Sequence, residues 1–203
     1  MQGSEGVSRA VVRRMRAAMP DKLTELRTRY GATVAKLPDF VSIEADELDI
    51  MSLEEFPAMF VVPVNTSGRQ DNRQTEATGT YDEYSFTYNL QIYVYARGDD
   101  YKSTSLRVKR YTLAAREVLL QQKVLLHEGG DSLTVEPRTI SENYSAMGRS
   151  PEGNKFIAGA YIDVQIVAEE RLQSVLEDVE AEVETDVVVV PHYAGLPVWN
   201  DGV

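Results

Sequence analysis

Residues 84–95 read Tyr-Ser-Phe-Thr-Tyr-Asn-Leu-Gln-Ile-Tyr-Val-Tyr, and this stretch decides the fold. Every even-numbered residue from Tyr84 to Val94 is aromatic or aliphatic, whereas the odd-numbered residues are polar as far as Gln91. Successive side chains of a β-strand point to opposite faces of a sheet, so the pattern predicts one buried face and one outer face. Residues 156–168 repeat the alternation, again with the apolar residues at even positions. Two such strands indicate a sheet that buries one side.

Two segments show the spacing of three and four residues that one face of a helix requires. The first carries Val12, Met15, Met19, Leu23, Leu26 and Tyr30. We expect residues 1–6 to be disordered, Ser8 to cap this helix near Arg9, Pro20 to kink or restart it, and Gly31 to end it.

The second helix is expected over residues 103–122, directly after the long strand. Asp100 or Ser103 is suited to cap it, because either side chain can accept hydrogen bonds from the amides of the first turn. The apolar stripe of this helix consists of Val108, Tyr111, Ala115, Val118 and Leu119.

Shorter strands complete the sheet. Residues 56–64 predict a strand with Pro57 and Pro63 at its ends or on a sheet edge, because proline cannot donate to a ladder. Residues 124–126 and 133–135 predict a hairpin. Residues 65–80 are polar, and they predict either a long, mobile loop or an extended hairpin tip.

The expected fold class is therefore α+β, a mainly antiparallel β-sheet packed by two or three helices, with an extended C-terminal arm. We expect one domain over residues 1–170, with residues 65–80 as its long loop, and an acidic extension over residues 171–203.

The 203-residue chain has a net charge of −11, and this charge is distributed unevenly. Residues 1–40 hold eight Lys and Arg against four acids, whereas residues 41–60 hold six acids and no base. Residues 169–186 hold eight acids and one base. The pattern fits either a solvated surface or charge complementarity between neighbouring copies. An acidic chain is also a poor candidate for tight duplex binding, which requires Lys and Arg to neutralise phosphates.

No chemistry-bearing motif emerges from the sequence. His127 and His192 have no second histidine at ligand spacing, and the chain contains no cysteine. The glycines form neither a nucleotide-binding fingerprint nor a nucleophile elbow. We therefore expect no enzyme activity, no cofactor and no metal. The apolar runs are far shorter than the ~20 residues that cross a bilayer, so no membrane contact is expected, and the protein is expected in the cytoplasm.

Several residues are candidates for contacts with other proteins. Tyr93 and Tyr95 lie on the otherwise polar face of the long strand, where they either meet a neighbouring subunit or pack beneath a loop or the C-terminal arm. The remaining candidates for a subunit interface are Arg107, Arg110, Val187, Val188, Val189, Val190 and Trp199. In the polar segment 65–80, Asn65, Arg69 and Arg73 are candidates for contact with a partner protein.

The order of these elements resembles that in a protein family of tailed bacteriophages, the tail-terminator and tail-to-head joining proteins. The resemblance covers about residues 10–170, and four stretches carry it: Phe56-Pro57-Ala58, residues 88–92, residues 110–116 and Ala160 to Glu169. It implies helices packed on a mainly antiparallel sheet and assembly as a homo-oligomeric ring, expected to be a hexamer.

The resemblance also implies a role for the protein. We expect a structural virion protein in the tail or neck, assembled in the host cytoplasm, that ends tube growth and joins the tail to the head. Its partners would be the tail tube protein and the connector or neck proteins, and genome DNA would pass through the lumen without specific binding. The alternatives are a neck, adaptor or other minor tail protein, and, in a different class, a bacterial α+β ligand-binding regulator.

Overall fold

Two helices and seven strands make up the part of the chain that the computed structural model describes, residues 3–45, 55–76, 79–126, 132–145, 148–149 and 155–173. In chain order they are α1 (Gly3–Tyr30), β1 (Ser42–Glu44), β2 (Ala58–Glu76), β3 (Gly79–Gly98), α2 (Tyr101–Gln121), β4 (Val124–Leu126), β5 (Ser132–Tyr144), β6 (Gly148–Arg149) and β7 (Phe156–Gln173).

The strands form one sheet in the order β1-β2-β3-β7-β5-β4, and β6 pairs with the start of β7. Every pairing is antiparallel except that of β1 with β2, which is parallel. The α+β class is thus confirmed, and the sheet is mixed because of the short strand β1, which the sequence analysis did not predict.

The two alternating segments lie side by side at the centre of the sheet. β3 pairs with β7 from Tyr81↔Gln173 to Gly98↔Phe156 without a register shift. Even-numbered residues therefore face even-numbered residues, as in Leu90↔Val164 and Ile92↔Ile162, and all four of these side chains are buried. The predicted buried face is confirmed from Tyr88 to Val94, whereas Tyr84 and Phe86 are half-buried.

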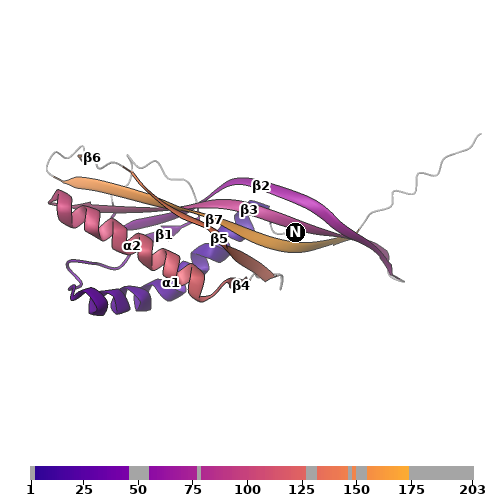
Figure 1. Cartoon of the computed structure of the whole chain (residues 1–203), viewed down its shortest axis with the longest axis horizontal. Helices are drawn as coiled ribbons and strands as arrows, with labels where there is room; N and C mark the ends of the chain where they lie inside the picture. Colours follow the sequence, from indigo (N-terminus) through magenta and orange to yellow (C-terminus); the bar gives the residue numbers. More distant parts are fainter. Residues whose placement is uncertain are drawn as a thin grey trace, which may run out of the picture.

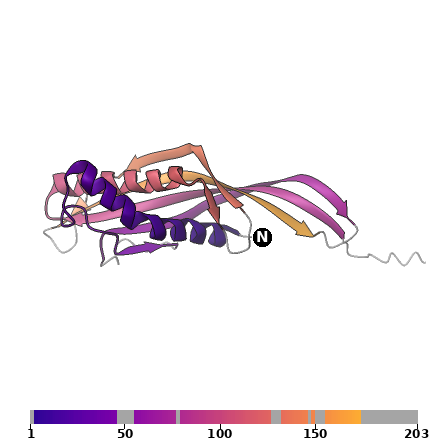
Figure 2. The ribbon, with the colours of Figure 1, turned by 90° about the horizontal axis from the view of Figure 1, so that it is seen from below.

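Helix α1 begins earlier than the sequence analysis predicted. It starts at Gly3, so Ser8 is not its cap but an interior residue, buried with an unpartnered Oγ. The helix runs through Pro20 without a restart, and its axis bends part-way along (Figures 1 and 2). A proline inside a helix removes one backbone hydrogen bond and is a common cause of such a bend. Gly31, with φ of +57°, ends the helix as predicted.

Both helices cover the same face of the sheet (Figures 1 and 2). Asp100 caps α2 by accepting a hydrogen bond from the Ser103 amide at 2.9 Å. The predicted apolar stripes of both helices are buried against the even face of β3 and β7, apart from Tyr30, which is exposed. The opposite face of the sheet carries no helix of the described chain.

Residues 65–76 and 79–80 are strand, which corrects the prediction of a loop and confirms the alternative of an extended hairpin. β2 and β3 pair as far as Glu76↔Gly79, and β7 continues beside β3 to Gln173. These three strands project past the helices (Figures 1 and 2). We call this projection, residues 64–76, 79–87 and 167–173, the arm. The domain therefore extends at least to residue 173, and the rest of the predicted C-terminal extension lies outside the described residues.

Candidate subunit interface

The outer strand of the arm is exposed along most of its described length. Its thirteen β2 residues, at about 3.3 Å each, span roughly 40 Å. All residues from Pro63 to Arg73 are exposed, and most of them are polar. β1 pairs only with Ala58 to Phe60, so along the rest of β2 no described strand covers the outer edge. Two register shifts, at Pro63/Asn65 and Gln70/Asn72, interrupt the ladder with β3.

A buried carboxylate holds the outer part of the arm together. Asp82 is 5% exposed and accepts hydrogen bonds from Gln70 Nε2 at 2.8 Å and from Arg73 Nε at 2.7 Å, with Arg73 Nη2 at 3.2 Å. The pairing with Asp82 raises the pKa of Arg73. Arg73, which the sequence analysis assigned to a partner protein, thus makes a two-pronged contact within its own hairpin.

The helix-side face of the arm carries an aromatic row. The ring of Phe86 stacks on Tyr84 with centroids 5.8 Å apart, and it is 6.2 Å from the ring of Tyr88. Phe86 also lies across Gly68, its partner on β2, so closely that a Cβ at Gly68 would overlap the ring. The absence of a side chain at Gly68 therefore lets this aromatic ring reach the outer strand of the arm.

The base of the arm is tied to the body. Asn89 Nδ2 donates to Asn65 Oδ1, so the second predicted partner-contact residue is also used inside the hairpin. The Tyr88 hydroxyl donates to buried Glu170 at 3.0 Å, and the first turn of α1 reaches Tyr88 through the backbone of Gly3. Burial and the contact with Glu170 raise the pKa of Tyr88 to about 12.

Arg69 remains as the outward-pointing member of the predicted trio. Its side chain is 80% exposed, and its Nε lies 2.7 Å from Asp71 Oδ1. An exposed ion pair of this kind stabilises little and is easily exchanged for a partner's acid.

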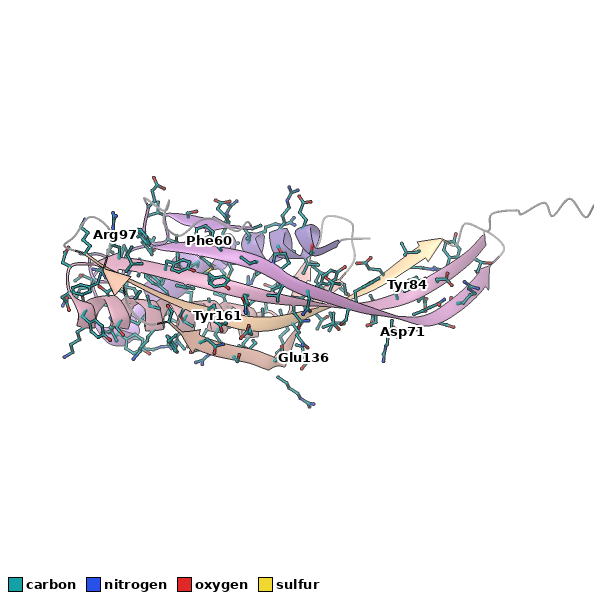
Figure 3. The ribbon with its side chains drawn as sticks, turned by 90° about the horizontal axis from the view of Figure 1, so that it is seen from above. Phe60, Asp71, Tyr84, Arg97, Glu136 and Tyr161 are labelled. Atoms are coloured by element: carbon teal, nitrogen blue, oxygen red, sulfur yellow. The ribbon has the colours of Figure 1, made fainter. Side chains whose placement is uncertain are left out.

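A second surface lies on the helix-free face of the sheet, which Figure 3 shows from above with Phe60 and Tyr161 labelled. Tyr93 stacks on Tyr95 at 6.2 Å and 7°, and it contacts Tyr161 at 5.4 Å. Phe60, from β2, lies 6.2 Å from Tyr95. Together with Phe56 they form what we call the aromatic cluster.

The structure separates the two tyrosines that the sequence analysis treated as a pair. Tyr95 is only 9% exposed, because its ring lies over Gly159 on β7 and against Phe60. Burial raises the pKa of Tyr95 to about 12. Tyr93 is half-buried, and its hydroxyl donates to Gln91 Oε1 at 2.6 Å. Tyr95 therefore belongs to a small core, whereas Tyr93 lies at the rim of the aromatic cluster.

A polar network borders the aromatic cluster. Asp163 on β7 accepts hydrogen bonds from Gln91 Nε2 at 2.9 Å, Asn143 Nδ2 at 2.7 Å and Ser141 Oγ at 3.1 Å. The network joins three neighbouring strands and continues to the Tyr93 hydroxyl. Asp163 was not predicted from the sequence, and its position on the odd face of a predicted strand was the available signal.

The two arginines of α2 that the sequence predicted at the interface have contacts within the subunit. Arg107 donates to the backbone carbonyls of Lys36, Ala35 and Arg97 at 2.9, 3.1 and 3.1 Å, which fastens the segment after α1 to α2 and β3. Arg110 lies with its Cζ 4.7 Å from the centroid of the Tyr30 ring. The structure thus gives both residues internal roles that the sequence did not indicate.

Much of the basic charge of α1 is also used internally. Lys22, 4% exposed, pairs with Glu25 at 2.6 Å and with Glu117 of α2 at 3.2 Å, and Arg29 Nη1 reaches Glu117 at 2.8 Å. The hydrogen bonds from Arg29 and Lys22 lower the pKa of Glu117. This cluster joins the two helices rather than two subunits.

The N-terminal half of α1 presents the remaining basic surface. Arg9, Arg13 and Arg16 recur at spacings of four and three residues and border an open groove of about 700 Å³ beside Glu44. Arg9 pairs with Glu5 at 2.6 Å and Arg16 with Glu44 at 2.7 Å, both across exposed side chains. This basic face is the part of the predicted charge complementarity that the structure leaves at the surface.

Other predicted residues lie outside the described chain, namely His127, His192, Val187 to Val190 and Trp199. Within the described residues, no three His, Cys, Asp or Glu side chains gather closely enough to hold a metal ion. No helix of the described chain is long and apolar enough to cross a membrane.

No protein-family model matches the chain, and no curated protein is significantly similar to it in sequence.

Proposed function

We propose that this protein is a structural subunit of a homo-oligomeric ring at the head-proximal end of a bacteriophage tail, where it ends growth of the tail tube and joins the tail to the head connector. The arm is the observation that supports a ring: it is a three-stranded projection whose polar outer edge, on β2, is covered by no described strand. The placement in a phage tail is supported by the sequence resemblance.

The arm supports assembly because its length brings no gain to an isolated subunit. Burial of apolar side chains is what repays the ordering of a chain, yet residues 63–73 bury almost nothing. A projection that reaches roughly 40 Å along β2 can instead lie against a neighbouring copy. The exposed edge of a β-sheet offers unpaired amides and carbonyls to such a partner.

Ring closure needs two different lateral patches that meet by rotation about one axis. The arm supplies one patch. The rim of the aromatic cluster around Tyr93, and the basic face of α1 at Arg9 and Arg13, supply candidates for the other. No reaction is part of this proposal, because its mechanism is surface complementarity. The net charge of −11 also suits a ring through which DNA passes without being held.

Two measurements test the proposal. The purified protein should form a closed particle of uniform mass, and antibody labelling in electron micrographs should place it between head and tail tube. Arg69→Glu, at the exposed side of the arm, should weaken the particle, whereas Lys109→Glu on the exposed side of α2 should leave it unchanged.

Three results would contradict or change the proposal, and they can be told apart. A single-copy protein that is absent from virions would contradict the whole proposal. A ring located elsewhere in the neck would replace the terminator by an adaptor. Saturable thermal stabilisation of a single-copy protein by a small molecule would favour the ligand-binding regulator instead.

A further inference from the structure

The chain beyond the arm carries a strict alternation of its own. Between residues 178 and 187, acids occupy the even positions, and small or β-branched residues occupy the odd ones: Asp178, Val179, Glu180, Ala181, Glu182, Val183, Glu184, Thr185, Asp186 and Val187. A period of two is the pattern of a β-strand with one acidic and one apolar face. Ten residues of strand span roughly 33 Å.

The outer edge of β2 in the arm has the matching length. β1 covers only Ala58 to Phe60, which leaves the edge from Val61 to Glu76 without a described partner strand. The opposite edge of the arm is much shorter, because β5 pairs with β7 as far as Ala168 and β7 ends at Gln173. β4 and β1 are three residues each. Among these edges of the described sheet, the outer edge of β2 is the one long enough for ten residues, and its register is uninterrupted from Asn65 to Gln70.

Both faces of the arm match the two faces of the segment. On the helix side, Gly68 and the half-buried ring of Phe86 lie next to the edge, where the apolar residues of an added strand would extend the aromatic row. On the other side, Arg69 is 80% exposed beside the edge, where the acids would pair with it. Strand addition gains its affinity from main-chain hydrogen bonds and its specificity from alternate side chains.

A second copy can supply this strand more readily than the same chain can. Residues 63–73 are exposed, and no strand of the described chain covers their outer edge. Four residues lie between Gln173 and Asp178, so their Cα atoms can be about 17 Å apart at full extension, whereas the path around β3 and β2 is about 14 Å in a straight line. Only a nearly straight chain would complete that path, while a neighbouring copy has no such restriction.

We propose that residues 178–187 of one copy add as a strand to the outer edge of β2 in the arm of the next copy. This inference rests on the proposed ring, because it needs a second copy beside the first. The contact joins different surfaces of the two copies, and contacts of this kind close into a ring or grow into a filament.

Disulfide trapping tests the contact in the full chain, since the protein contains no cysteine. Ser67→Cys places a thiol on the arm, and Glu182→Cys and Val183→Cys place one on each face of the segment. A mixture of Ser67→Cys with one of the two should give a disulfide-linked pair of chains under mild oxidation, because adjacent strands bring Cα atoms within the ~4.4–6.8 Å that a disulfide needs. Lys109→Cys, on the exposed side of α2, is the control and should give at most a tenth of that yield.

Two outcomes of the trapping would overturn the inference. Yields no higher than the Lys109→Cys control would show that the segment does not lie on the arm. A disulfide that forms within one chain of the Ser67→Cys, Val183→Cys double variant, in a single-copy protein, would assign the segment to its own subunit.

A proline variant separates this inference from the ring itself. Val183→Pro removes a strand amide and should raise the protein concentration needed for assembly at least tenfold, whereas Asn200→Pro, outside the segment, should not change it. If the wild-type protein is a single copy, the ring and the strand addition both fail. If the wild type is a ring and Val183→Pro assembles equally well, only the strand addition fails.

Discussion

Replacing Tyr95 by alanine should unfold the aromatic cluster rather than merely weaken assembly. The Tyr95 ring is 9% exposed and fits between Phe60 and Gly159. Removing a buried aromatic side chain typically costs about 3–5 kcal/mol of stability. Because this cluster is small and lies at one face of the sheet, we take the lower end, about 3 kcal/mol. For a chain of this length the melting temperature should fall by roughly 6–12 °C.

A double-mutant cycle makes the expectation sharper. A Cβ at Gly159 would lie 2.8 Å from Cε1 and 2.9 Å from Cδ1 of Tyr95. Gly159→Ala alone should therefore cost about 1–3 kcal/mol through overpacking. In the double variant the new methyl group enters the space that the ring has left, so the two costs should sum to less than their separate values.

Urea denaturation at a protein concentration too low for assembly measures these differences. Tyr144→Ala is the matched control, because that tyrosine is 48% exposed and its loss should cost less than about 0.5 kcal/mol. Tyr93→Ala should lower stability less than Tyr95→Ala and reduce assembly more. A loss below about 1 kcal/mol for Tyr95→Ala, or strictly additive costs with Gly159→Ala, would refute the packing described for this cluster.

Three further perturbations follow from individual contacts. Glu117→Gln should destabilise the α1–α2 pair by about 1–2 kcal/mol at pH 7, because it weakens the pairing of the buried Lys22; thermal unfolding measures this loss. The pKa of Glu117 is lowered in the folded protein, so the wild type should lose this contribution as the pH falls below about 4. The variant should show no such loss. Above pH 10 the unfolded protein ionises its tyrosines, whereas Tyr88 and Tyr95 resist ionisation until about pH 12, so stability should fall between these values; a flat profile there would contradict their burial. Asp82→Asn should speed amide hydrogen exchange in the outer arm and leave exchange in α2 unchanged, because it weakens the hydrogen bonds from Arg73. Equal exchange rates in the arms of the wild type and the variant would show that the arm does not need this ion pair.

Strict periodicity is what made part of the fold predictable. The alternation in β3 and β7 identified the central strands and their buried faces, since a one-residue shift would expose every apolar side chain. The stripes of α1 and α2 and the caps at Asp100 and Gly31 were readable for the same reason: each depends on residues close in sequence.

The arm could not be predicted in this way because residues 63–73 of its outer strand β2 are all exposed. Residues 65–74 contain no apolar side chain, and without a buried face the sequence shows no alternation of apolar and polar residues. Its order comes instead from pairing with β3 and from contacts such as Arg73 with Asp82 and Phe86 over Gly68, which depend on a register that the sequence does not reveal. The cluster around Asp163 was missed for a related reason, because it joins three strands that are distant in sequence.

The mass of the purified, full-length protein in solution tests the central claim most directly. Light scattering across a range of protein concentrations should give one closed particle whose mass is an integral multiple of the 22.7 kDa chain, with six copies the expected number. Arg69→Glu should raise the protein concentration at which the particle assembles, because the arm supplies one side of the contact between subunits. A particle of 22.7 kDa at every concentration tested would contradict the account.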